Sequence, residues 1–98
     1  MRPNYTLEAR LEVMEAVAWY FEQEKELAAD FDRELKEAEK GIEEFPDFWG
    51  SLGGEYHRYL LKRFPYSVVY RIEPDEVVIV AVAAHKRGSD YWRKVGKR

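Results

Sequence analysis

The sequence contains no cysteine, and this absence excludes several functions at once. Without thiols the chain has no disulfide scaffold, no thiolate metal site and no cysteine nucleophile. Long apolar runs are also missing, because none approaches the roughly 20 residues that a membrane-spanning helix needs. The N-terminal Met1-Arg2-Pro3-Asn4 is not followed by the apolar stretch of a signal peptide. We therefore expect a soluble cytoplasmic protein that has no membrane association.

Several motifs of enzyme chemistry are absent as well. There is no HExxH, and the two histidines, His57 and His85, are far apart in the sequence, which argues against a metal site. The glycine-rich segment 50–54 lacks the Lys-Ser/Thr that follows a phosphate-binding loop. No serine lies in the context of a nucleophile elbow. We expect neither a metal nor another cofactor.

What remains is a short chain with an uneven distribution of charge. Its 98 residues, of which 46% are hydrophobic, fit one domain that spans residues 1–98. Residues 1–56 hold 6 Lys/Arg and 15 Asp/Glu, whereas residues 57–98 hold 10 Lys/Arg and 4 Asp/Glu. The split indicates either a surface that attracts polyanions or acidic helices beside a basic sheet with no partner implied.

The first half has two stretches in which apolar residues recur at spacings of four and three, as on one face of a helix. The first stretch comprises Leu7, Leu11, Met14, Ala18 and Phe21; the second comprises Leu27, Phe31, Leu35, Ala38 and Ile42. We expect both sets to be buried. The short polar segment 23–26 between them favours an antiparallel helical hairpin, which Pro46 ends.

The second half has the pattern of strands. Residues 48–54 are expected to form a loop, because three of the seven are glycine. Residues 56–64 and 66–72 alternate in character, as strands do, and residues 73–76 are typical of a hairpin turn. The apolar run 77–84 predicts a central strand that is covered on both faces. The expected fold is α+β: an N-terminal helical hairpin packed on a twisted antiparallel sheet of three to four strands, with a short C-terminal element.

Basic and aromatic side chains are interleaved along these predicted strands. They are His57, Arg58, Lys62, Arg63, Arg71, His85, Lys86 and Arg87, with Tyr56, Tyr59, Tyr66, Tyr70, Tyr91 and Trp92. Cations hold phosphates and aromatic rings stack on unpaired bases, so the set fits a site for single-stranded RNA. Metal-free cleavage would use His85 or a tyrosine as acid or base, and arginines as phosphate clamps. In the alternative interpretation, Tyr66 and Tyr70 belong to the core and Arg71 pairs with Glu73 or with a carboxylate of a helix.

The order of these residues resembles the RelE/ParE toxin superfamily, the toxin half of type II toxin–antitoxin, or plasmid stabilisation, modules. The most specific feature is the segment 63–66, Arg-Phe-Pro-Tyr, followed by the strand 79–82, Ile-Val-Ala-Val, and a final Tyr91-Trp92. The resemblance covers nearly the whole chain and implies the same α+β layout. The chain departs from many relatives at Ser89, where they have proline, and at His57, where they have a further arginine.

The resemblance implies two mechanisms. RelE-like members cleave messenger RNA on the ribosome without a metal, whereas ParE-like members poison DNA gyrase and are not enzymes. We expect the mRNA endonuclease, with gyrase inhibition as the alternative and a relative without toxicity as a third possibility. For cleavage, the candidate catalytic residues are Arg58, Arg63, His85, Arg87 and Tyr91. The implied partner is a cognate antitoxin, in a toxin–antitoxin heterotetramer unless the chain forms a homodimer.

Overall fold

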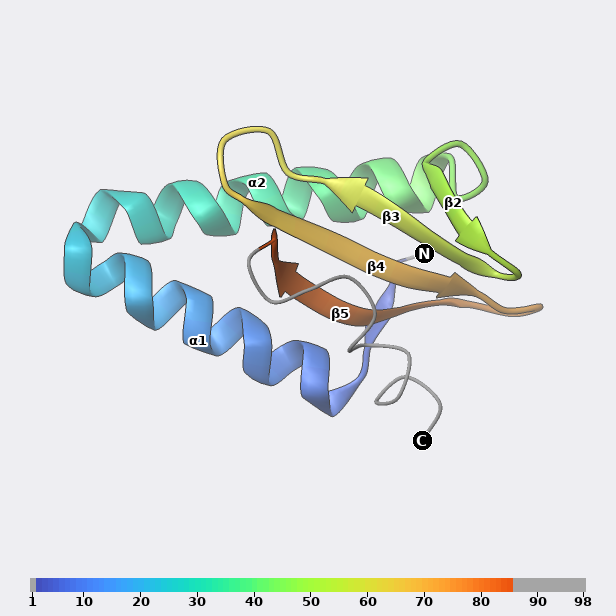
Figure 1. Ribbon diagram of the computed structural model, residues 1–98, viewed down its shortest axis with the longest axis horizontal. Coiled ribbons are helices and arrows are strands. Elements are labelled where there is room, and N and C mark those ends of the chain that lie inside the picture. The colour runs from blue at the N-terminus through green and yellow to red at the C-terminus, as the bar shows by residue number, and fades with distance from the viewer. Residues whose placement is uncertain (1, 86–98) are drawn as a thin grey trace.

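A computed structural model describes residues 2–85 of the chain (Figure 1). Arg87 and Tyr91, two of the candidate catalytic residues, lie outside the described residues. The elements in chain order are β1 (Asn4–Tyr5), α1 (Leu7–Gln23), α2 (Lys25–Glu44), β2 (Gly50–Gly53), β3 (Tyr56–Leu60), β4 (Tyr66–Ile72) and β5 (Val77–Ala84). No helix among residues 2–85 is long and apolar enough to cross a membrane.

The strands form one sheet in the order β1-β5-β4-β3-β2. The expected helical hairpin packed on a sheet is confirmed, but the sheet has five strands and is mixed, because β1 runs parallel to β5. The prediction of three to four antiparallel strands was wrong at both edges. At one edge, β1 has only two residues, too few to produce an alternating pattern. At the other, the predicted loop contains β2, which pairs with β3 in an irregular register.

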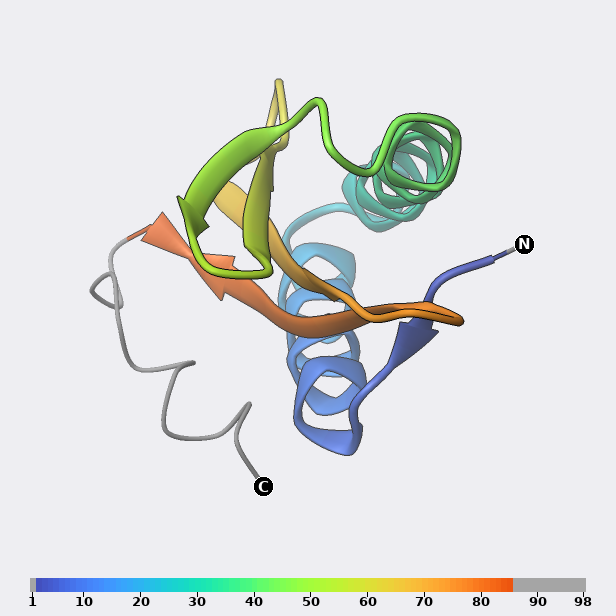
Figure 2. The ribbon, with the colours of Figure 1, turned by 90° about the vertical axis from the view of Figure 1, so that its right-hand side faces the viewer.

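Both helices cover the same face of the sheet (Figure 2). Four of the five residues of the stripe predicted for α2 are buried against β4 and β5, namely Phe31, Leu35, Ala38 and Ile42, whereas Leu27 is only partly buried. The opposite sheet face, which we call the far face, has a second buried cluster of Val69, Val78, Val80, Ala81 and Ala83. The predicted central strand β5 is therefore covered on both faces, as expected. Val69 and Tyr70 of β4 pair with Ala81 and Ile79 of β5, so Val80 between these two partners is an extra residue, a β-bulge. Because of this bulge, the neighbours Val80 and Ala81 both belong to the far-face cluster.

The buried face of α1 is not the one that the sequence pattern predicts. The five residues expected in the core are exposed: Leu7 (68%), Leu11 (48%), Met14 (65%), Phe21 (57%) and Ala18. The helix instead buries Ala9 and Ala16, with Val13, Val17 and Tyr20 partly buried beside them. The prediction was wrong because α1 has apolar residues on two opposite sides, and the side with the smaller residues packs against the sheet.

Carboxylates on the helices bind backbone N–H groups of the sheet layer. Glu12 of α1 accepts a hydrogen bond of 2.8 Å from the N–H of Val82, on the part of β5 that extends beyond its pairing with β1. Glu34 of α2 is buried and accepts bonds of 2.6 and 2.9 Å from the N–H groups of Lys62 and Arg63. These bonds fix the segment between β3 and β4 against α2. They therefore also fix the backbone from which the Arg63 side chain extends.

The packing of α1 predicts that two matched substitutions have different effects on the free energy of unfolding. Ala9→Leu forces extra carbon atoms into the contact between α1 and the sheet, where Ala9 is fully buried, and is expected to lower the free energy of unfolding by about 1–3 kcal/mol. Ala18→Leu adds the same atoms on the exposed side and is expected to change it by less than about 0.5 kcal/mol. Urea unfolding followed by circular dichroism measures both, and a larger loss for Ala18→Leu would contradict the observed orientation of α1.

The buried carboxylate of Glu34 makes a second prediction. Glu34→Ala leaves two backbone donors of residues 62 and 63 without their acceptor, so we expect a loss of about 2 kcal/mol in the free energy of unfolding. Glu37→Ala, three residues along α2 and exposed, is the matched control and should cost less than about 0.5 kcal/mol. Equal stability of the two variants in urea would show that the Glu34 contacts contribute nothing.

Candidate functional site

Of the candidate arginines within residues 2–85, Arg58 is the one that lies in a strand of the sheet. It lies on β3 opposite Val69 and points to the far face, since its neighbour Tyr59 packs in the core on the helix side. The Arg58 side chain is exposed and forms no ion pair with any of residues 2–85. It therefore presents a guanidinium to solvent, available for an anionic group of a partner.

His85 also belongs to the far face. Its backbone N–H donates to the carbonyl oxygen of Pro65 at 2.9 Å, which fixes the end of β5 beside the segment before β4. Its Nε2 lies 3.1 Å from Oγ of Ser67, on the same side of β4 as Val69, the partner of Arg58. Arg58 and His85 thus share a sheet face, with Ser67 positioned between their strands.

Arg63 is separated from this pair. Its guanidinium turns towards α2, where it lies 3.4 Å from a carboxylate oxygen of Asp30 and over the ring of Phe64. The same carboxylate accepts a hydrogen bond of 2.6 Å from Arg33, the largest of the causes that hold the pKa of Asp30 below its usual value. An ion pair with a helix residue places Arg63 on the helix side. Of the three candidates within residues 2–85, Arg58 and His85 share a sheet face on strands that β4 separates, and Arg63 lies apart from both.

Two tyrosines of the basic and aromatic set belong to the core, as the alternative interpretation of the sequence expects. Tyr70 is fully buried, and its hydroxyl donates to the carbonyl oxygen of Pro46 at 2.5 Å. Tyr66 packs against the same core cluster. Burial raises the pKa of both phenols above the ordinary value, which makes them poor proton donors or acceptors near neutral pH.

The remaining polar members of the set are held by local contacts. His57 is largely buried, with Nδ1 2.9 Å from the carbonyl oxygen of Trp49 and its ring stacked on Tyr70. Arg71 donates from Nε to Glu73 at 2.5 Å, which confirms the pair expected from their spacing. Both residues have contacts that account for their positions without a ligand.

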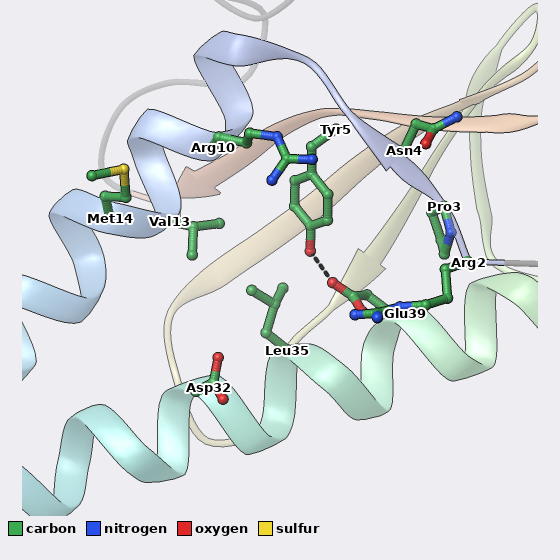
Figure 3. Close-up of a pocket in the computed structure, with 10 residues that line it drawn as sticks. All are labelled: Arg2, Pro3, Asn4, Tyr5, Arg10, Val13, Met14, Asp32, Leu35 and Glu39. Atoms are coloured by element: carbon green, nitrogen blue, oxygen red, sulfur yellow. Dashed lines mark hydrogen bonds and ion pairs between the residues drawn. The ribbon is translucent and has the colours of Figure 1, made fainter.

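A groove that sequence reasoning did not find lies between β1, α1 and α2 (Figure 3). It has a volume of about 570 Å³. In it the Tyr5 hydroxyl donates to Glu39, and Arg2 lies 3.6 Å from the same carboxylate. Burial is the main cause that raises the pKa of Tyr5, and the bond to Glu39 adds to it. The sequence carries no signal for this groove, because Tyr5 and Glu39 are 34 residues apart.

Metal chemistry has no candidate within residues 2–85. No group of three or more His, Cys, Asp or Glu side chains in that part of the chain could hold a metal ion. The chemistry that the described site offers is therefore an exposed guanidinium and an imidazole on one sheet face.

Comparisons with known proteins assign the chain to a family. The profile of the "ParE toxin of type II toxin-antitoxin system, parDE" matches residues 4–88. A solved structure described as "Chromosomal ParDE TA system from P. aeruginosa" superposes with a TM-score of 0.74 over 86% of this chain and 95% of that chain. Its 19% identity makes this a similarity of fold. No curated protein matches the sequence. The profile covers most of the sequence, and the chain belongs to the ParE toxin family of type II toxin–antitoxin systems.

Proposed function

We propose that this toxin acts by binding and inhibiting DNA gyrase and does not cleave RNA. Membership of the ParE family makes the chain the toxin of a type II toxin–antitoxin module. Gyrase poisoning is the activity that the ParE side of the superfamily resemblance implies. The structural observation that supports this choice is the position of Arg63, whose ion pair with Asp30 on α2 removes it from Arg58 and His85.

The chemistry of RNA cleavage makes this separation important. Cleavage without a metal needs an acid, a base and cations within hydrogen-bond reach of one phosphate. Residues 57–85 hold four Lys/Arg and three Asp/Glu, and two of the four cations, Arg63 and Arg71, are engaged by carboxylates. The described strands therefore offer few unpaired cations to a polyanion, and the other six Lys/Arg of the second half belong to residues 86–98. A toxin that binds a protein needs only a complementary surface.

The mRNA endonuclease stays as a second candidate because of one observation. Arg58 and His85 share the far face, so a guanidinium and an imidazole lie on the same surface. In that case Arg58 would clamp the phosphate and His85 would act as acid or base. Arg87 and Tyr91 would complete the site, as the superfamily resemblance implies.

The partner of a type II toxin is a cognate antitoxin, and we extend that expectation to this chain as a ParE-family member. The expected oligomers, a homodimer or a toxin–antitoxin heterotetramer, stay predictions. Size-exclusion chromatography with and without the antitoxin distinguishes them.

Two assays on the purified protein separate the candidate targets. We expect the protein to inhibit supercoiling by purified gyrase and to trap cleaved DNA, because a binding toxin stalls the enzyme on its substrate. In a translating lysate we expect no new mRNA ends by primer extension. Codon-phased mRNA cuts without an effect on gyrase would overturn the proposal in favour of the endonuclease, and inactivity in both assays would overturn both.

A pair of matched variants tests the contribution of the far face. Arg58→Ala removes the exposed guanidinium, and we expect about tenfold weaker inhibition of gyrase with unchanged folding. Lys36→Ala removes an exposed cation of α2 and should leave inhibition unchanged. Equal activity of the two variants would show that the far face does not contact the target.

A further inference from the structure

Two adjoining cavities lie beside the last residues of β5, on the edge that β1 is too short to cover. The first has a volume of about 190 Å³ and the second a volume of about 290 Å³. Both are lined by Trp19, Tyr66 and Ala84, so they form one cleft, which we call the edge cleft. Glu12 and Glu15 of α1 also line the first cavity. No lysine or arginine among residues 2–85 lines either cavity.

Aromatic rings form two walls of the edge cleft. Trp19 on α1 is 57% exposed, and its indole N–H has no hydrogen-bond partner among residues 2–85. Tyr66 on β4 is held in place by edge contacts with Tyr20 and Phe31, whose ring centroids lie 6.2 and 5.1 Å from its own. The face of an aromatic ring attracts a cation, and the indole of tryptophan does so most strongly. The walls of the cleft therefore favour a positively charged ligand.

The polar groups at the first cavity include several acceptors of hydrogen bonds. Glu12 accepts the N–H of Val82, and Glu15 is exposed and forms no ion pair with any of residues 2–85. Since the N–H of Val82 points away from β4, the carbonyl oxygen of the same residue points to this side too. Burial is the largest cause that raises the pKa of Tyr66, and the charges of Glu15 and Glu12 add to it. The potential at this wall of the cleft is therefore negative.

From this arrangement we infer that the edge cleft binds a guanidinium group on a short alkyl stem. A guanidinium has five N–H donors in one plane, stacks on aromatic rings and is more weakly hydrated than an ammonium group. Its head lies in the first cavity, between Trp19 and the two carboxylates, and its stem lies in the second cavity against Tyr20 and Pro65. The inference does not depend on whether the toxin acts on gyrase or on mRNA.

The test compares n-butylguanidinium with neutral n-butylurea, which has nearly the same shape. Nuclear magnetic resonance follows binding through the backbone amide of Ala84, which lines both cavities. We expect a saturable shift with n-butylguanidinium and at least about tenfold weaker binding of n-butylurea. No saturable shift with n-butylguanidinium, or equal binding of the two probes, would overturn the inference.

Two pairs of matched variants show whether the probe binds in the edge cleft. Glu15→Gln removes a carboxylate of the cleft and Trp19→Leu removes its indole, and we expect each to weaken binding of n-butylguanidinium by about threefold or more. Glu22→Gln and Phe21→Leu make the same kinds of change at exposed positions of α1 outside the cleft and should leave binding unchanged. Circular dichroism checks folding in each case. If Glu22→Gln weakened binding as much as Glu15→Gln, the probe would follow the overall charge of α1, and the inference would be overturned.

Two larger probes distinguish the sources of such a group. Agmatine is a free guanidino compound, and N-acetylarginine N-methylamide presents the same group as the side chain of a peptide. Tighter binding of the blocked arginine would assign the edge cleft to an arginine of a peptide, and tighter binding of agmatine would assign it to a free small molecule. Failure of both to shift the Ala84 amide would overturn the inference.

Discussion

The close approach of α1 to the sheet is the constraint on which the rest of the structure depends. Ala9 and Ala16 are buried at this contact, and because an alanine side chain ends at Cβ, the helix backbone lies near β1 and β5. At that distance Glu12 reaches the N–H of Val82, which β1 is too short to pair. Leu7, Leu11, Met14 and Phe21 lie on the opposite side of α1, where they are exposed to solvent.

The helical layer and the sheet layer are joined by carboxylates as well as by the apolar core. Glu12 and Glu34 bind backbone N–H groups, and Asp30 binds the guanidinium of Arg63. The acidic half of the sequence therefore does more than coat an exposed surface. Its carboxylates bind hydrogen-bond donors of the second half, including the guanidinium of Arg63, which the hypothesis of RNA cleavage uses as a phosphate clamp. The contact between Asp30 and Arg63 is the structural observation that supports our proposal of a binding function.

How well each element could be predicted depends on how clearly its apolar and charged residues separate the buried positions from the exposed ones. The α2 stripe was predictable because its other positions are mostly charged, and β5 because apolar residues fill every position. The helix α1 has apolar residues on two opposite sides, so its pattern alone does not show which side is buried. The side with most of the large residues was expected in the core, and it is the exposed side. The local pair of Arg71 and Glu73 could be predicted from the sequence. The pair of Arg63 and Asp30 could not, because its members are 33 residues apart and meet only after α2 docks.

The orientation of α1 is tested most directly by the chemical reactivity of Met14, which lies on the exposed side of the helix. Peroxide oxidises exposed methionine readily, and burial slows the reaction. We predict that Met14 of the native protein is oxidised within about threefold of its rate in concentrated urea, as mass spectrometry of its peptide would measure. Protection by about tenfold or more in the monomeric native protein would place Met14 in the core and contradict the account.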